Sequence, residues 1–184
     1  MSKAVLISIR PKWVEKIVNG EKTIEVRKTR PKLETPFKCY IYCTLPKYPH
    51  EDFIATDYPR PQFYGGGKVI GEFTCERIAL IAYDGGELSS TTNAAFSPAT
   101  CLTQTEIIAY IGDKGRCYGW HISDLLIYDQ PRELSEFRRA TDPCDSCHAE
   151  YTWECTGCKK LSGDIKRPPQ SWCYVAEAEE DDAL

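Results

Sequence analysis

Short runs of apolar residues, many of them β-branched or aromatic, recur along the chain between clusters of Gly, Pro, Asn and Asp. Runs of this length and composition are typical of β-strands. The pattern predicts strands at residues 4–9, 23–28, 38–44, 68–77, 118–128 and 172–176.

Two segments have apolar residues at helical spacing instead. In residues 11–20, Pro11 suits the first turn and Gly20 suits the exit, with apolar side chains at Trp13, Val14, Ile17 and Val18. The second helix is expected after Thr103, because Glu106 three residues later completes a capping box. Its apolar positions are Ile107, Ile108 and Ile111, and Gly112 is the expected stop.

The predicted strands outnumber the predicted helices. Residues 46–67 and 83–100 are rich in Pro, Gly, Ser, Thr and Asn, so we expect long loops there. Short strands with two interspersed helices favour an α+β, mainly β fold. We expect a curled, mostly antiparallel sheet or small β-barrel with two flanking helices.

The strand predicted at 23–28 carries charge on one face. Thr23, Glu25 and Arg27 alternate with Ile24 and Val26, and alternate side chains of a strand point to opposite faces. One interpretation is a solvated sheet face with an ordinary Glu/Arg ion pair. The other is the floor of a polar site.

Charge is unevenly distributed along the sequence. The net charge is −4, but residues 1–50 hold 11 Lys and Arg against 4 Asp and Glu, which gives +7 and leaves −11 for the rest. The acidic balance argues against a surface coated with phosphate-binding side chains, whereas the basic N-terminal part suits a local anionic ligand. The acidic residues 177–184 are expected to be a disordered tail.

The hydropathy pattern contains no segment suited to a bilayer. No apolar run approaches the roughly 20 residues that span a membrane, and the apolar stretch near the N-terminus is too short for a secretory signal. We therefore expect a cytoplasmic protein without a membrane partner. Ten cysteines in a reducing compartment favour metal binding over a disulfide framework.

Four of the cysteines have metal-site spacing. Cys144 and Cys147 form one C-x-x-C pair, and Cys155 and Cys158 form a second after a seven-residue spacer. Such pairs present four thiolates to one tetrahedral zinc, which would be structural because no coordination position stays open. His148 could replace one thiol, and a redox dithiol or unliganded thiols are the alternatives. The remaining six lack this spacing and are expected to be small core residues: Cys39, Cys43, Cys75, Cys101, Cys117 and Cys173.

Four ordered blocks of sequence resemble a known family. They are residues 7–27 with the pattern G-x-K-x-x-E-x-R at Gly20, Lys22, Glu25 and Arg27, residues 67–73, residues 118–124, and residues 168–174. Together they resemble ASCH-domain proteins of the PUA-like superfamily, especially small bacterial and phage members. The resemblance implies a PUA-like β-barrel. It also implies a cleft that binds RNA, a nucleotide or a modified base. We expect one domain over residues 1–176, in which the four-cysteine, zinc-binding insert occupies residues 141–163.

Some proteins similar in this region are N4-acetylcytidine amidohydrolases that use a Lys, a Thr and a Glu. The resemblance matches Lys22 to the Lys and Glu72 to the Glu, but Glu25 stands where those enzymes have Thr. A hydrolase acting on a modified nucleoside or RNA would then need Glu25 or Glu72 as general base, with Lys22 or Arg27 stabilising negative charge.

The alternative is a binding module. Lys12, Lys22 and Arg27 would contact phosphates or a base edge, and Glu25 and Glu72 would accept hydrogen bonds from base amino groups. The stacking planes expected for bases are Trp120 and Trp172, each of which could instead be a core residue. A protein-interaction role is the third hypothesis.

Overall fold

The computed structural model describes residues 2–45, 66–94, 98–140 and 163–177. Its strands are β1 (Lys3–Ile9), β2 (Ile24–Arg27), β3 (Phe37–Cys43), β4 (Val69–Asp84), β5 (Glu87–Ser90), β6 (Arg116–Arg132) and β7 (Trp172–Ala176). The α-helices are α1 (Pro11–Val18) and α2 (Gln104–Ile111), and short 3₁₀ turns are η3 (Pro98–Thr100), η4 (Gly112–Lys114) and η5 (Leu134–Glu136).

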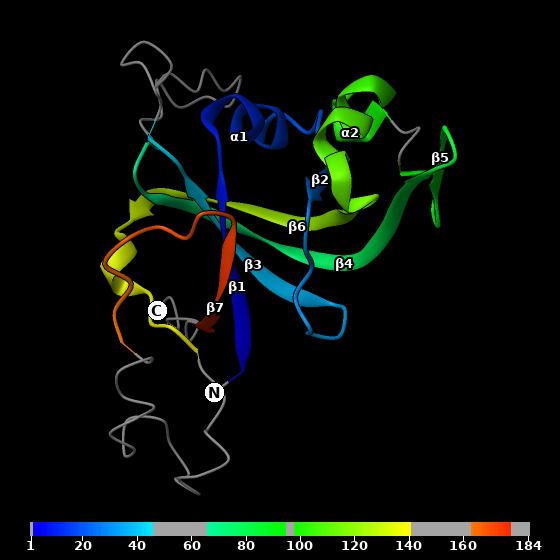
Figure 1. Ribbon diagram of the computed structural model, residues 1–184. Helices are drawn as coiled ribbons and strands as arrows, with labels where there is room; N and C mark the ends of the chain where they lie inside the picture. Colours follow the sequence, from blue (N-terminus) through cyan, green and yellow to red (C-terminus); the bar gives the residue numbers. More distant parts are fainter. Residues whose placement is uncertain (1, 46–65, 95–97, 141–162, 178–184) are drawn as a thin grey trace, which may run out of the picture.

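The seven strands form one curled sheet in the order β2-β6-β4-β3-β1-β7, with β5 paired to β4 outside that path (Figure 1). All neighbouring pairs are antiparallel except β1 and β3, which are parallel. The parallel pair is possible because α1 and β2 lie between these strands in sequence and provide the crossover.

The core lies on both faces of the central strands. In β1, Val5 and Ile7 pack in one apolar cluster and Ala4 and Leu6 pack in another, as the alternation of a strand requires. Helix α1 covers the first cluster through Val14 and Ile17, and α2 packs on a third cluster that includes Ile24 and Val26 of β2. Both helices lie toward the upper end of the sheet in Figure 1, with β2 between them. This arrangement places β2 at the sheet edge between the two helices.

The expected mainly β, α+β architecture with two flanking helices is confirmed. Of the two expected forms, the structure has the curled sheet, which is not closed into a barrel within the described residues. Two details were wrong. Strands β4 and β6 run well past their predicted ends, since they pair with each other over most of their length. Part of the expected loop at 83–100 is strand β5, a hairpin partner of β4.

Two expectations from the sequence fall mainly outside the described residues. The four cysteines Cys144, Cys147, Cys155 and Cys158 lie in segment 141–162, and all but the first residue of the 177–184 tail is likewise outside. Within the described part of the chain, no group of three or more His, Cys, Asp or Glu residues is arranged to hold a metal ion. None of the described helices is long and apolar enough to cross a membrane.

The six other cysteines are free thiols. Cys39, Cys43, Cys75 and Cys117 are buried, as expected for core residues, whereas Cys101 and Cys173 are partly exposed. Burial raises the pKa of the Cys75 thiol to about 12 and that of Cys117 to about 11. These two side chains are therefore protonated packing groups at neutral pH and poor nucleophiles.

Candidate functional site

The charged strand expected from the sequence is the floor of a pocket between α1, β2 and α2. The helix–turn–strand order explains its position, because Gly20 adopts a left-handed φ of 76° and turns the chain from α1 toward β2. Ile24 and Val26 then pack toward α2, and Glu25 and Arg27 point to the other side. The pocket has a volume of about 1050 Å³.

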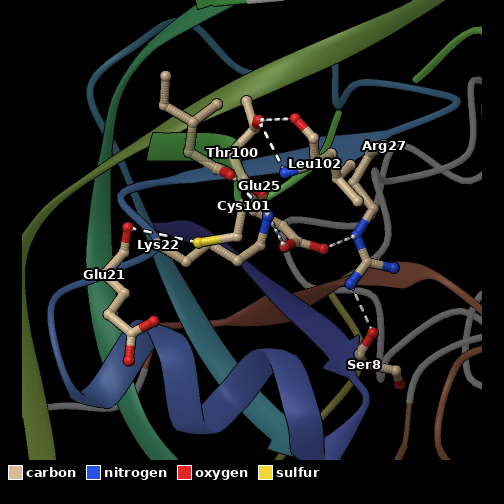
Figure 2. A network of polar contacts seen from close by, with 9 residues as sticks. Ser8, Glu21, Lys22, Glu25, Arg27, Thr100, Cys101 and Leu102 are labelled. Atoms are coloured by element: carbon tan, nitrogen blue, oxygen red, sulfur yellow. Dashed lines mark hydrogen bonds and ion pairs between the residues drawn. The ribbon is translucent and has the colours of Figure 1, made fainter. Parts of the chain in front are cut away.

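Three charged side chains of this floor are almost fully buried and form one ionic cluster, the buried triad of Lys22, Glu25 and Arg27 (Figure 2). Lys22 Nζ lies 3.4 Å from Glu25 Oε2, and Arg27 Nε lies 3.0 Å from Glu25 Oε1. One carboxylate thus compensates two cations. The triad carries a net charge of +1 in a region where uncompensated charge is costly.

Backbone carbonyls accept further hydrogen bonds from the two cations of the triad. Lys22 Nζ donates to the carbonyl of Ile24 at 2.8 Å and to that of Thr100 at 2.7 Å. Arg27 Nη2 donates to the carbonyl of Ser8 at 2.6 Å, and Nη1 makes a longer contact of 3.4 Å with Ser171 Oγ. Burial lowers the pKa of Lys22, while the neighbouring carboxylate opposes that shift. Three acceptors around Nζ suit the ammonium form of Lys22.

Four exposed cations surround this floor, and we call them the rim cations: Arg10, Lys12, Lys28 and Lys114. They come from the start of α1, the end of β2 and the turn after α2. Among the described residues, none of the four pairs with a carboxylate within 4.0 Å. These positive charges are therefore available to a ligand.

Within the described part of the chain, two carboxylates line the pocket, Glu25 and Glu106. Glu25 is held between two cations, as described above. Glu106 accepts from the backbone N–H and the hydroxyl of Thr103 in the capping box of α2, and these bonds lower the pKa of its carboxyl. A carboxylate whose pKa is lowered in this way is a weak general base, so Glu106 is poorly suited to proton abstraction.

The structure brings together Lys12, Lys22, Glu25 and Arg27 from the predicted site but leaves out Glu72. Phe73 packs under α1, and strand alternation therefore turns Glu72 to the opposite face of the sheet. There its carboxylate accepts a 2.5 Å hydrogen bond from Tyr128 and pairs with Lys38 at 3.1 Å. Contrary to the expectation from the sequence, Glu72 is therefore not part of this pocket.

The two tryptophans expected to stack on bases do not line the pocket either. Trp120 has no exposed surface and packs against Phe37 and Trp172, so its faces are unavailable to a ligand. Trp172 is partly buried, stacks its edge against Tyr174 and donates from Nε1 to Thr29 Oγ1. The structure favours their interpretation as core residues.

Two aromatic residues that line the pocket were not predicted from the sequence, Trp13 of α1 and Tyr110 of α2. Trp13 has helical apolar spacing, which predicts burial, yet it is only partly buried. One side of the pocket, formed by residues 168–171, was not predicted either. These residues are joined to the floor of the pocket only by tertiary contacts. Ser8 makes one such contact, donating from Oγ to the carbonyl of Pro169 at 2.7 Å.

The comparisons with known proteins found similarity of fold only. No protein-family model and no curated protein matches the sequence. The crystal structure of ASCH from Zymomonas mobilis aligns with 95% of this chain and 88% of its own, with a TM-score of 0.56 and 18% identity. A tyrosine-to-phenylalanine mutant of that protein aligns with 96% of this chain and 92% of its own, with a TM-score of 0.57 and 18% identity. The chain therefore has the fold of this ASCH structure.

Proposed function

We propose that this chain, with its ASCH-type fold, binds RNA, a nucleotide or a modified base in the pocket between α1, β2 and α2. The observation that supports this most is the charge of the lining. Among the described lining residues, six cationic side chains face two carboxylates, in a chain whose net charge is −4. Positive charge concentrated in one hollow of an acidic protein selects an anionic ligand locally.

Phosphate groups fit the rim cations best. Exposed ammonium and guanidinium groups contact phosphates without needing a fixed geometry, whereas the side chains of the buried triad already contact one another and backbone carbonyls. The guanidinium Nη1 of Arg27 and the Ser171 hydroxyl remain at the floor as donors for a base or sugar, because their mutual contact is long at 3.4 Å.

The hydrolase alternative receives less support from the same residues. Lys22 donates to two carbonyls, Glu25 is clamped by two cations, and Glu72 lies on the opposite face of the sheet. A general base needs a free acceptor within reach of its substrate. We therefore favour ligand binding over hydrolysis as the function of this pocket.

Binding and turnover can be separated in one experiment. A labelled single-stranded RNA of about eight nucleotides is titrated with the protein, and the same mixture, with a panel of modified nucleosides, is analysed for products. We expect binding in roughly the micromolar range that weakens with salt, and no product. Product formed at a rate that falls in Lys22→Ala would favour the hydrolase, and the absence of binding to RNA, nucleotides and nucleosides would refute the proposal.

We propose separately that Cys144, Cys147, Cys155 and Cys158 hold one structural zinc ion. The support is their spacing in the sequence, two C-x-x-C pairs that can supply four thiolates. Protein purified without chelator should contain about one zinc per chain. The double variant Cys144→Ser/Cys147→Ser should lose the metal, and the control Cys101→Ser/Cys173→Ser should keep it. A zinc content well below one per chain in the native protein would contradict this assignment.

A further inference from the structure

Two aromatic rings of the pocket, one partly exposed and one exposed, each have a lysine ammonium over them. Lys12 Nζ lies 4.4 Å from the centroid of the Trp13 ring, and Lys28 Nζ lies 5.1 Å from the centroid of the Tyr110 ring. All four residues line the same pocket.

The two rings are held in place from the protein side. Trp13 packs against the apolar cluster under α1, and its ring also lies 5.2 Å from the Nζ of buried Lys22. Tyr110 is 36% exposed, in the helix that packs against β4 and β6 through its neighbours Ile107 and Ile111. Both rings are thus anchored on helices while part of their surface remains open to the pocket.

The two ammonium groups are held loosely by comparison. Lys12 and Lys28 are exposed, and within the described part of the chain neither is paired with a carboxylate at 4.0 Å or less. An exposed cation–π contact is a weak interaction. Stacking of a nucleobase on the same ring is stronger, and the displaced ammonium can move to the phosphate attached to that base.

We propose that Trp13 and Tyr110 are stacking platforms for two bases of one unpaired nucleic-acid strand, with Lys12 and Lys28 moving from the rings to the phosphates. This inference rests on the proposed function and specifies its ligand as a strand of at least two nucleotides. A pocket of about 1050 Å³ is at the upper end of the range for small-molecule sites, which suits more than a single nucleotide.

The length of the ligand provides the first test. Adenosine monophosphate, the dinucleotide and an oligoadenylate of about eight nucleotides are titrated under the same conditions. A second stacked base should make the dinucleotide bind at least about tenfold more tightly than the monophosphate. Equal affinities for the two would overturn the stacking proposal and leave the proposed function standing. If none of the three binds, the stacking proposal fails, and the proposed function fails with it unless a nucleoside of the panel binds.

Substitution of the rings provides the second test. Trp13→Leu and Tyr110→Leu should each weaken binding of the longest strand about tenfold, with an unchanged slope of log affinity against log salt, because stacking releases no counterions. Trp13→Phe and Tyr110→Phe should recover most of that loss. Tyr83→Leu, a partly buried tyrosine outside the pocket lining, is the matched control. Thermal unfolding of each variant checks that it is folded.

These variants also distinguish stacking from a merely structural role. A structural role predicts that affinity falls together with the unfolding temperature and is not recovered by Phe. Full affinity in folded Trp13→Leu and Tyr110→Leu would overturn the proposal. It would also be overturned if these variants changed only the slope of log affinity against log salt.

Discussion

Glu25→Ala should lower the free energy of unfolding by about 3–5 kcal/mol, because it removes the one carboxylate that compensates two buried cations. The side chains of Lys22, Glu25 and Arg27 are 2%, 7% and 10% exposed. Without Glu25, Lys22 retains two carbonyl acceptors and Arg27 retains the carbonyl of Ser8, but both charges lose their counterion. Chemical denaturation at neutral pH measures the difference.

The chain contains a matched control for this prediction. Glu21 pairs with Lys16 at 2.7 Å, but these side chains are 52% and 39% exposed. Water screens such a pair, so Glu21→Ala should destabilise the protein far less than Glu25→Ala does. Equal effects of Glu21→Ala and Glu25→Ala would show that the triad is not buried in solution as the structure has it.

Removing the four rim cations should nearly abolish RNA binding. Each phosphate contact on a single strand contributes about 0.7 to the slope of log affinity against log salt, so neutralising Arg10, Lys12, Lys28 and Lys114 should lower that slope by about 3. At 0.1 M salt this corresponds to a loss of roughly 10²–10³-fold in affinity. Titration of the same RNA at several salt concentrations measures both quantities.

The control is a second quadruple variant that changes the net charge by the same amount at positions outside the pocket. Neutralising four cations outside the pocket lining, Lys3, Lys68, Arg77 and Arg138, should leave most of the slope and affinity in place. If both quadruple variants lose affinity equally, RNA is attracted by the overall charge of the protein and not by the pocket.

The local elements were predictable because each has a local cause. The capping box of Thr103 and Glu106 begins α2 and Gly112 ends it, as expected. The alternation in 23–28 correctly separated Glu25 and Arg27 from Ile24 and Val26. These residues were also the part of the site that could be found from the sequence, since their side chains converge within one strand and the turn before it.

The rest of the site depends on which face of the sheet a residue occupies. Alternation shows that Glu72 and Phe73 point in opposite directions, but it does not say which face has the pocket. The curled sheet is packed on both faces, so Trp120 in an alternating strand is fully buried. Ser171 contacts Arg27 across 144 positions of sequence, a proximity that only the folded chain provides.

A crystal structure of the protein with a bound oligoadenylate would locate the ligand directly. We expect its phosphates beside the rim cations and its bases on Trp13 and Tyr110, over the buried triad. An oligonucleotide bound on the opposite face of the sheet, beside Glu72 and Tyr128, would contradict the proposed binding site.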